Sequence, residues 1–414
     1  MRILVISNLY PPHYLGGYEL GCRDVVNGLR QRGHEVMVLA SAYGMPKPRA
    51  DGHVYCRLAV DLSPSRSGFL PRALAELARK ELTNRRAFVS LCRSFRPDLV
   101  YVWNVMFLFG SVTSAFLAQK MGVPVAILVF DHRLSRWERV DPWRSFCMRQ
   151  PQRPWRRLLG AGLRWLVEIL DNPLRRDLYS SHLQFASQFL KREALEKGKP
   201  VESAPVIYRG IDLQQFTLRE ESRPAQRLLY VGQLIPSKGV RPAIEALDLL
   251  VQRHNQKQLS FTIVGSGIDS AYQASLRELV RQRCVQGYVS FLGAVPRTRL
   301  PEPYQEHDIL LFRSIWEEPF GIASLEATAS GLVPVATASG GSAEIFEDEY
   351  NSLVFPKEDA ERCAVQIMRP VTDEGFYESL RLNARKPIKE RFQLDRTVDE
   401  TKSHLCQIVT RAAL

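Results

Sequence analysis

Short apolar runs alternate with longer amphipathic stretches along the first half of the chain. Short runs rich in Val, Ile and Leu are typical of buried strands, whereas apolar positions that recur every three or four residues are typical of helices. The expected strands span residues 3–7, 35–40, 99–103, 125–130 and 184–187. The expected helices between them span residues 18–32, 71–95 and 111–121. This alternation predicts a parallel sheet with right-handed crossovers.

The same alternation begins again in the second half. The expected strands span residues 227–231, 260–264, 289–292, 309–312, 333–336 and 353–355, and the expected helices span residues 241–254, 272–284, 323–330 and 342–347. A chain of 414 residues also exceeds one ordinary core. We therefore predict an α/β protein with two doubly wound, Rossmann-like domains, residues 1–210 and 211–385. A helical segment, residues 386–414, is expected to pack back on the first domain.

Composition narrows the class of protein. No run of about 18 apolar residues occurs, so no membrane-spanning helix is expected. The N-terminus has the pattern of a buried strand and lacks the regions of a signal peptide. None of the seven cysteines stands in a C-x-x-C pair or at metal spacing from a histidine. This usage is typical of a reduced, cytoplasmic protein.

The positive charge is concentrated in the first half of the chain. Residues 1–200 hold 31 Lys and Arg against 16 Asp and Glu, a net of +15, while the remainder has a net of −3. Residues 131–180 contain eleven arginines and four tryptophans. Arg and Trp together suit a contact at the headgroup level of a membrane. An anionic membrane, a phosphate-bearing acceptor or nucleic acid could be the partner, and an ordinary solvated basic face is the alternative.

Glycine-rich junctions between strands and helices supply the first candidate chemistry. Gly16 and Gly17 follow the first strand, where exposed backbone N–H groups can approach a diphosphate. Lys238 and Gly239 open a helix after the strand that ends at residue 231, and this lysine can meet phosphate oxygens. Gly340 and Gly341 form a similar junction later in the chain. In a doubly wound domain such strand ends converge on a single crevice.

The strongest signal is the segment of residues 316–327, which contains two carboxylates eight residues apart, Glu318 and Glu326. Phe320, Gly321 and Ile322 place N–H groups at the start of a helix, where the dipole favours an anion. Glu318 lies before that helix and can reach sugar hydroxyls. Glu326 lies about two turns further on and is suited to a ribose.

Taken in order, these motifs make the chain resemble the retaining glycosyltransferases of family 4, whose GT-B fold has two Rossmann-like domains that face across a cleft. Residues 29–36, 208–212 and 263–267, the last containing Gly265, extend the resemblance over nearly the whole chain. It implies that a sugar passes from a nucleoside diphosphate sugar, such as a UDP- or GDP-sugar, to a glycan or lipid-linked acceptor with retention of configuration.

The resemblance also implies roles for individual residues. Glu318 contacts the donor sugar, assisted by the N–H groups of Phe320, Gly321 and Ile322, and Glu326 holds the ribose. Lys238 neutralises the leaving diphosphate, and Gly232, Gln233 and Gly265 bind the donor at neighbouring strand ends. Gly16 and Gly17 approach the diphosphate from the other domain. Members of this kind need no metal or other cofactor, and the chain has no D-x-D motif.

Two positions depart from the family pattern. Gln233 stands where many members have arginine after the glycine that follows the strand. Many members also have a histidine at the end of the fifth strand of the first domain, a place that Asp131 or His132 could take. A catalytically inactive GT-B scaffold subunit and a GT-B sugar-nucleotide epimerase are therefore the alternative functions. No nucleic-acid-binding motif is found. A cytoplasmic enzyme, peripheral on the inner face of the membrane, is expected.

Overall fold

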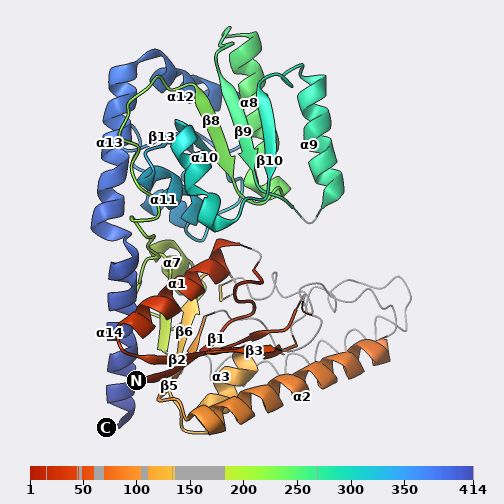
Figure 1. Ribbon diagram of the computed structural model, residues 1–414, viewed down its shortest axis with the longest axis vertical. Coiled ribbons are helices and arrows are strands. Elements are labelled where there is room, and N and C mark those ends of the chain that lie inside the picture. Colours follow the sequence, from red (N-terminus) through yellow and green to blue (C-terminus); the bar gives the residue numbers. More distant parts are fainter. Residues whose placement is uncertain are drawn as a thin grey trace. The chain divides into compact units, whose positions relative to one another are not determined.

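The computed structural model describes residues 1–14, 16–43, 45, 49–59, 70–103, 111–132, 134–135, 182–267 and 269–413. The chain divides into two compact units (Figure 1). The first unit contains Met1–Ile207 together with Val398–Leu414, and the second contains Tyr208–Thr397. Each unit is an α/β domain built on one sheet.

The first unit has a seven-stranded sheet in the order β3-β4-β2-β1-β5-β6-β7. Its strands are β1 (Arg2–Ile6), β2 (Glu35–Ser41), β3 (Arg49–Asp51), β4 (Val54–Leu58), β5 (Leu99–Val102), β6 (Val125–Val129) and β7 (His182–Phe185). All neighbouring strands are parallel except β3 and β4. Helix α1 (Gly17–Gln31) lies on one face, and α2 (Leu70–Phe95) and α3 (Ser111–Lys120) lie on the other (Figure 1).

The second unit has a six-stranded, fully parallel sheet in the order β10-β9-β8-β11-β12-β13. Its strands are β8 (Arg227–Val231), β9 (Ser260–Val264), β10 (Val289–Gly293), β11 (Ile309–Phe312), β12 (Val333–Ala336) and β13 (Leu353–Val354). The strand order reverses between β8 and β11. In doubly wound sheets such a reversal opens a crevice at the carboxyl ends of the strands, where ligands bind.

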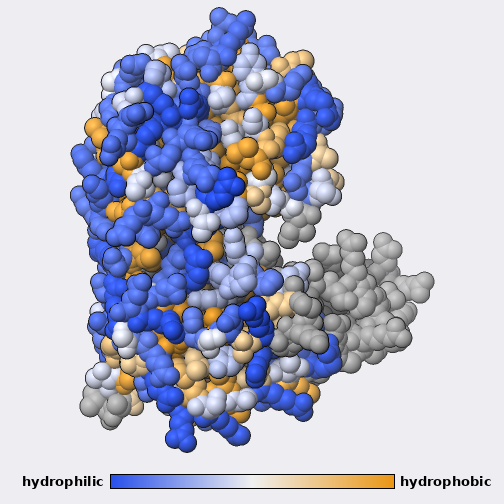
Figure 2. All heavy atoms as spheres, viewed as in Figure 1, coloured by the Kyte–Doolittle hydropathy of each residue, from blue (hydrophilic) through white to orange (hydrophobic). Residues whose placement is uncertain are grey.

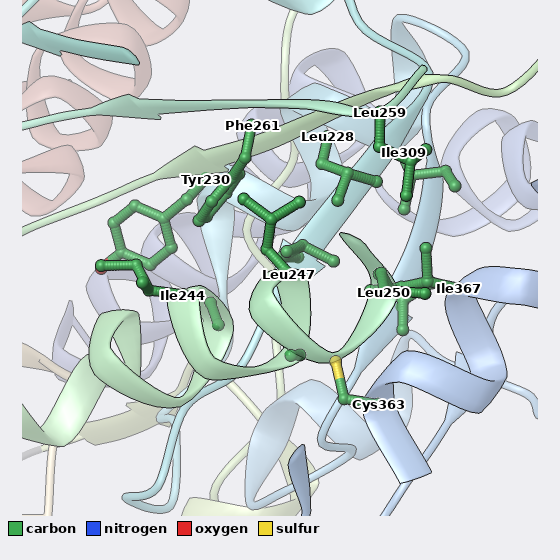
Figure 3. Packing of buried hydrophobic residues seen from close by; sticks show 14 of the residues in the cluster. Leu228, Tyr230, Ile244, Leu247, Leu250, Leu259, Phe261, Ile309, Cys363 and Ile367 are labelled. Atoms are coloured by element: carbon green, nitrogen blue, oxygen red, sulfur yellow. The ribbon is translucent and has the colours of Figure 1, made fainter. Parts of the chain in front are cut away.

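Two hydrophobic cores hold this second sheet, one on each face. Alternate side chains of a strand point to opposite faces. Leu228 and Tyr230 therefore pack with α8 (Val240–Gln252), α9 (Ser270–Gln282) and α12 (Ala360–Thr372), as Figure 3 shows for Leu247, Leu250 and Cys363. On the other face, residues of β8 and β11 pack with α10 (Pro301–Glu306), α11 (Ile322–Ala329) and the end of α13 (Glu374–Arg391). Both faces are covered, as a parallel sheet requires.

Most of the expected strands and helices are present, and the exceptions have physical reasons. The sequence did not predict β3 and β4, because β3 has only three residues, two of them charged, and Arg57 interrupts the short apolar run of β4. The helix expected at residues 342–347 is wrong: a single 3-10 turn, Gly341–Glu344, replaces it. Helix α14 (Leu394–Ala413) ends the chain, and its Val398 would be only 2.5 Å from a Cβ at Gly28 of α1, so glycine permits that close approach.

The surface seen in Figure 2 is mostly hydrophilic, with apolar residues in small separate groups. Within the described residues, no helix combines the length and the apolar character needed to cross a membrane.

Candidate functional site at the carboxyl edge of the second sheet

The site is built around an ion pair between the two central strands of the second sheet. Lys238 ends a 3-10 turn (Pro236–Lys238) after β8, and Glu318 follows β11. The Lys238 Nζ donates to the Glu318 Oε1 at 2.6 Å. The Glu318 side chain is 6% exposed and that of Lys238 28% exposed. The pair therefore lies where the strand order reverses, with its cation turned partly toward solvent.

Close backbone contacts place both partners. The loop after β8 is tied to the loop after β11, because the Ile315 N–H donates to the Ser237 carbonyl at 2.9 Å. Gly239 has φ +70°, and a Cβ there would lie 1.8 Å from the Arg313 carbonyl oxygen. Only glycine allows this approach without displacing the backbone. The position of Lys238 therefore depends on the glycine that follows it.

Glu318 sits on extended backbone, outside the helix. It forms a β-bridge with Gly340, whose φ is +65° and whose Cβ would lie 2.5 Å from the Glu318 carbonyl oxygen. The Gly341 N–H donates to that same oxygen at 2.6 Å. The contacts with Gly340 and Gly341 thus fix the backbone position of Glu318.

Glycines also end the neighbouring strands at this edge. The Gly232 N–H donates to Val264, and the Gly265 N–H donates to Gly293. Gly265 has φ +142°, and a Cβ there would lie 1.8 Å from the Gly232 carbonyl oxygen. Gln233 is exposed beside them, and its carbonyl accepts the Tyr230 hydroxyl at 2.8 Å. The described structure therefore brings Gly232, Gln233 and Gly265 together.

Helix α11 begins next to Glu318. Gly321 is its N-cap with φ +105°, and among the described residues no side-chain hydrogen bond caps the first turn. The first N–H groups of a helix have no acceptor within the helix, so an uncapped start such as that at Ile322 favours an anion. Phe320 is buried and stacks on Tyr208, with ring centroids 5.6 Å apart. This packing anchors the turn that presents the N–H groups.

Glu326 lies on the second turn of α11 and is held by two donors. The Arg297 Nε donates to Oε1 at 2.9 Å, and the Tyr304 hydroxyl donates to Oε2 at 3.2 Å. Burial raises the pKa of the Glu326 carboxyl, while Arg297, Tyr304 and the charge of Arg209 oppose that rise. Sequence reasoning missed Arg297 and Tyr304, because a contact across 29 residues leaves no local pattern.

The remaining predicted residues lie in the first unit. Gly16 is the N-cap of α1, and its N–H donates to the Glu19 carboxylate at 3.1 Å. Gly17 begins the helix. Tyr18 packs against Trp103 and Phe130, with ring centroids 6.2 Å and 5.1 Å away. Gly16 and Gly17 therefore lie at the carboxyl edge of the first sheet, beside the ends of β5 and β6.

Asp131 and His132 follow β6 at the same edge of the first sheet. His132 is 1% exposed, and its Nδ1 lies 2.8 Å from the Glu193 Oε2 on α7 (Gln188–Glu196). The Ser135 hydroxyl donates to the same oxygen. Asp131 is partly exposed. A histidine whose ring is held by a carboxylate is fixed in orientation and tautomer, and Glu193 is a partner that the sequence did not reveal.

The sequence also predicts a segment that contacts a membrane and a reaction without a metal ion. The Arg- and Trp-rich segment, residues 133–165, lies almost wholly outside the described residues. Among the residues that are described, no three His, Cys, Asp or Glu side chains gather in an arrangement that could hold a metal ion.

Two family models match adjoining parts of the chain. Residues 15–215 match the model "Glycosyltransferase Family 4", and residues 215–387 match "Glycosyl transferases group 1". Together these matches run over most of the chain. The chain belongs to the family 4 type of glycosyltransferases.

Relatives and solved structures agree with this class. An uncharacterized glycosyltransferase of Methanocaldococcus jannaschii is 27% identical over 97% of each chain. Glycogen synthase of Mycobacterium tuberculosis is 28% identical over 90% of this chain and 86% of its own. The crystal structure of Anabaena HepE with UDP and glucose has a TM-score of 0.70 at 19% identity, covering 98% of this chain and all of that one. Sucrose-phosphate synthase of Thermosynechococcus elongatus has a TM-score of 0.73 at 19% identity, covering 99% of each. The fold is GT-B, as the sequence predicted.

Proposed function

We propose that the chain transfers a hexosyl group from a nucleoside diphosphate sugar to a glycan or lipid-linked acceptor with retention of configuration. The observation that carries the proposal is the Lys238–Glu318 pair beside the uncapped start of α11. It puts a cation, a carboxylate and free N–H groups at one edge of a sheet. The crystal structures of Anabaena HepE with UDP and with UDP-glucose support a donor of this class.

The chemical steps follow from the charges. The bond between the anomeric carbon and the diphosphate breaks as an oxocarbenium-like centre develops, and negative charge collects on the departing phosphate. Lys238 and the N–H groups of Phe320, Gly321 and Ile322 stabilise that charge, because they are already oriented before the reaction. Glu318 accepts hydrogen bonds from the sugar hydroxyls, and Glu326 accepts them from the ribose. The acceptor hydroxyl oxygen forms the new bond to the anomeric carbon, and its proton passes to the departing phosphate.

Donor binding requires the Lys238–Glu318 pair to open. Lys238 moves from the carboxylate to the diphosphate, and Glu318 turns to the sugar. The resemblance to family 4 also assigns roles in donor binding or catalysis to Gly16, Gly17 and Asp131 or His132 of the first unit. Gln233 leaves one phosphate cation fewer than many relatives have, so Lys238 carries a larger share of that charge.

The proposed reaction uses no metal. Lys238 and the start of α11 take the place of a cation bound by a D-x-D motif. A thermal-shift screen with UDP, GDP and ADP and their sugars, run with and without chelator, tests the donor, because a ligand of the native state raises the Tm. A transfer assay with the donor so found distinguishes this enzyme from a scaffold subunit. Loss of activity in chelator, restored by magnesium or manganese, would contradict the metal-free reaction.

We also propose that the basic first half contacts an anionic membrane surface on the cytoplasmic side. The net charge of +15 over residues 1–200 supports this. Each basic group at an anionic surface contributes about 1 kcal/mol. Co-sedimentation with vesicles of phosphatidylcholine, with and without phosphatidylserine, tests it. Binding that requires phosphatidylserine and weakens with salt is expected, and equal binding to both vesicles would contradict it.

A further inference from the structure

We infer that Arg297 is a positioning residue for this reaction: with Tyr304 it orients the carboxylate of Glu326 so that one acceptor site on each oxygen remains for the two ribose hydroxyls. The inference rests on the proposed function, because it takes Glu326 as the ribose ligand. It adds two residues that come from other elements, the 3-10 turn Arg297–Arg299 and α10.

The Glu326 carboxylate has more acceptor sites than its two donors use. A carboxylate offers about four lone-pair sites, two on each oxygen. Arg297 uses one site on Oε1, and Tyr304 uses one on Oε2. Within the described part of the chain, no other side chain or backbone group donates to this carboxylate. One site per oxygen is therefore left, which matches the two adjacent hydroxyls of a ribose.

The two donors are themselves rigid. Both lie against Phe216: the Arg297 guanidinium carbon is 5.7 Å from the ring centroid, and the Tyr304 ring packs edge-on at 5.9 Å. The Arg297 carbonyl accepts a hydrogen bond from the Gln215 side chain at 3.1 Å. Arg297 is 5% exposed and Tyr304 is fully buried. Because these two donors hold the Glu326 carboxylate in place, it loses little conformational freedom when the nucleotide binds.

Arg297 also lowers the pKa of the Glu326 carboxyl by its charge and its hydrogen bond. Burial raises the pKa of Glu326, and the three groups that oppose this are Arg297, Tyr304 and Arg209. A protonated carboxyl would lose acceptor capacity toward the ribose. Without Arg297 the pKa rises further. Nucleotide affinity should then fall as the pH is lowered, and it should recover at higher pH.

The test compares a nucleotide with its 2′-deoxy form. The probe is whichever of UDP, GDP or ADP binds the wild-type chain. Arg297→Met should weaken its binding about tenfold or more, reduce the preference for ribose over deoxyribose, and make the Kd pH-dependent. At saturating donor, kcat should change little. Tyr304→Phe should show the same pattern more weakly, and Arg297→Lys should lie between wild type and Arg297→Met.

Arg219→Met is the matched control, since Arg219 forms a comparably buried ion pair with Asp308 away from this site. It should lower stability and leave the ribose preference unchanged. If Arg297→Met does not fold, Arg297→Lys decides. Wild-type ribose preference in the Arg297 variants, together with its loss in Glu326→Gln, overturns the inference and leaves the proposed function intact. Unchanged binding in Glu326→Gln as well shows instead that the proposed donor site is wrong.

Discussion

The second sheet carries a buried network of carboxylate and arginine at each edge, and the two networks differ in the acceptor capacity that they leave. At the amino edge, Asp308 accepts four hydrogen bonds. Arg219 and Arg223 donate to Oδ1 at 3.1 Å and 2.7 Å, and the backbone N–H groups of Gln226 and Arg227 donate to Oδ2 at 3.1 Å and 2.9 Å. The carboxylate is saturated, so it can only support the fold.

At the carboxyl edge the carboxylates are also buried, but they accept fewer hydrogen bonds. Glu326 accepts two hydrogen bonds and Glu318 accepts one through its side chain. Burying a carboxylate with unfilled acceptor sites is costly unless something else fills them. The difference therefore distinguishes the structural network at the amino edge from the proposed binding site at the carboxyl edge of the same domain.

The largest expected effect is at the amino edge. Asp308→Ala removes the acceptor of four hydrogen bonds, so two arginines lose their carboxylate and two backbone N–H groups lose their acceptor. The free energy of unfolding should fall by about 3–5 kcal/mol, as for other broken buried ion pairs. Denaturant unfolding measures this. Nucleotide affinity of the folded fraction should be unchanged, and a specific loss of affinity would erase the distinction between the edges.

The second largest effect is a loss of transfer rate when Lys238 at the carboxyl edge is replaced. Lys238→Met should lower kcat about 100- to 1,000-fold, the usual cost of removing one preorganised donor to a developing anion. Transfer measured at saturating donor tests this. Arg241→Met, a nearby arginine on α8, is the control for simple loss of positive charge. A wild-type kcat in Lys238→Met would exclude Lys238 as the diphosphate ligand.

A smaller effect on stability is expected to distinguish Gly239 from Gly293, two glycines with nearly equal φ. Gly239 and Gly293 have φ +70° and +74°, but a Cβ at Gly239 meets the Arg313 carbonyl while one at Gly293 meets nothing within 4 Å. Gly293→Ala should cost about 1–2 kcal/mol from its φ alone. Gly239→Ala should cost more and should also slow transfer, because Lys238 is displaced. Equal unfolding curves for the two variants would count against this packing.

The smallest effect is on stability at the carboxyl edge. The double variant Lys238→Met/Glu318→Gln removes both charges together, so the free energy of unfolding should change by about 1 kcal/mol or less. Asp308 offers no such rescue, because two of its donors are backbone groups. A loss of stability as large as that of Asp308→Ala would mean that the Lys238–Glu318 pair is structural.

The sequence predicted the elements of this domain better than its contacts. Strand ends and glycine junctions are local patterns, so Lys238, Glu318 and Gly340 could be placed at one edge of a sheet in advance. The pairing of Lys238 with Glu318 could not, since 80 residues separate them. Arg297 shows the same limit, because its role depends on the fold that brings its turn against α11.

Hydrogen–deuterium exchange with and without saturating donor nucleotide sugar, UDP-glucose first, tests the central claim most directly. If the carboxyl edge is the donor site, the amides of residues 232–239 and 316–324 become protected, and those of residues 226–228 and 308–310 at the amino edge do not. Binding that protects the amino edge, or that leaves residues 316–324 unprotected, would contradict the account.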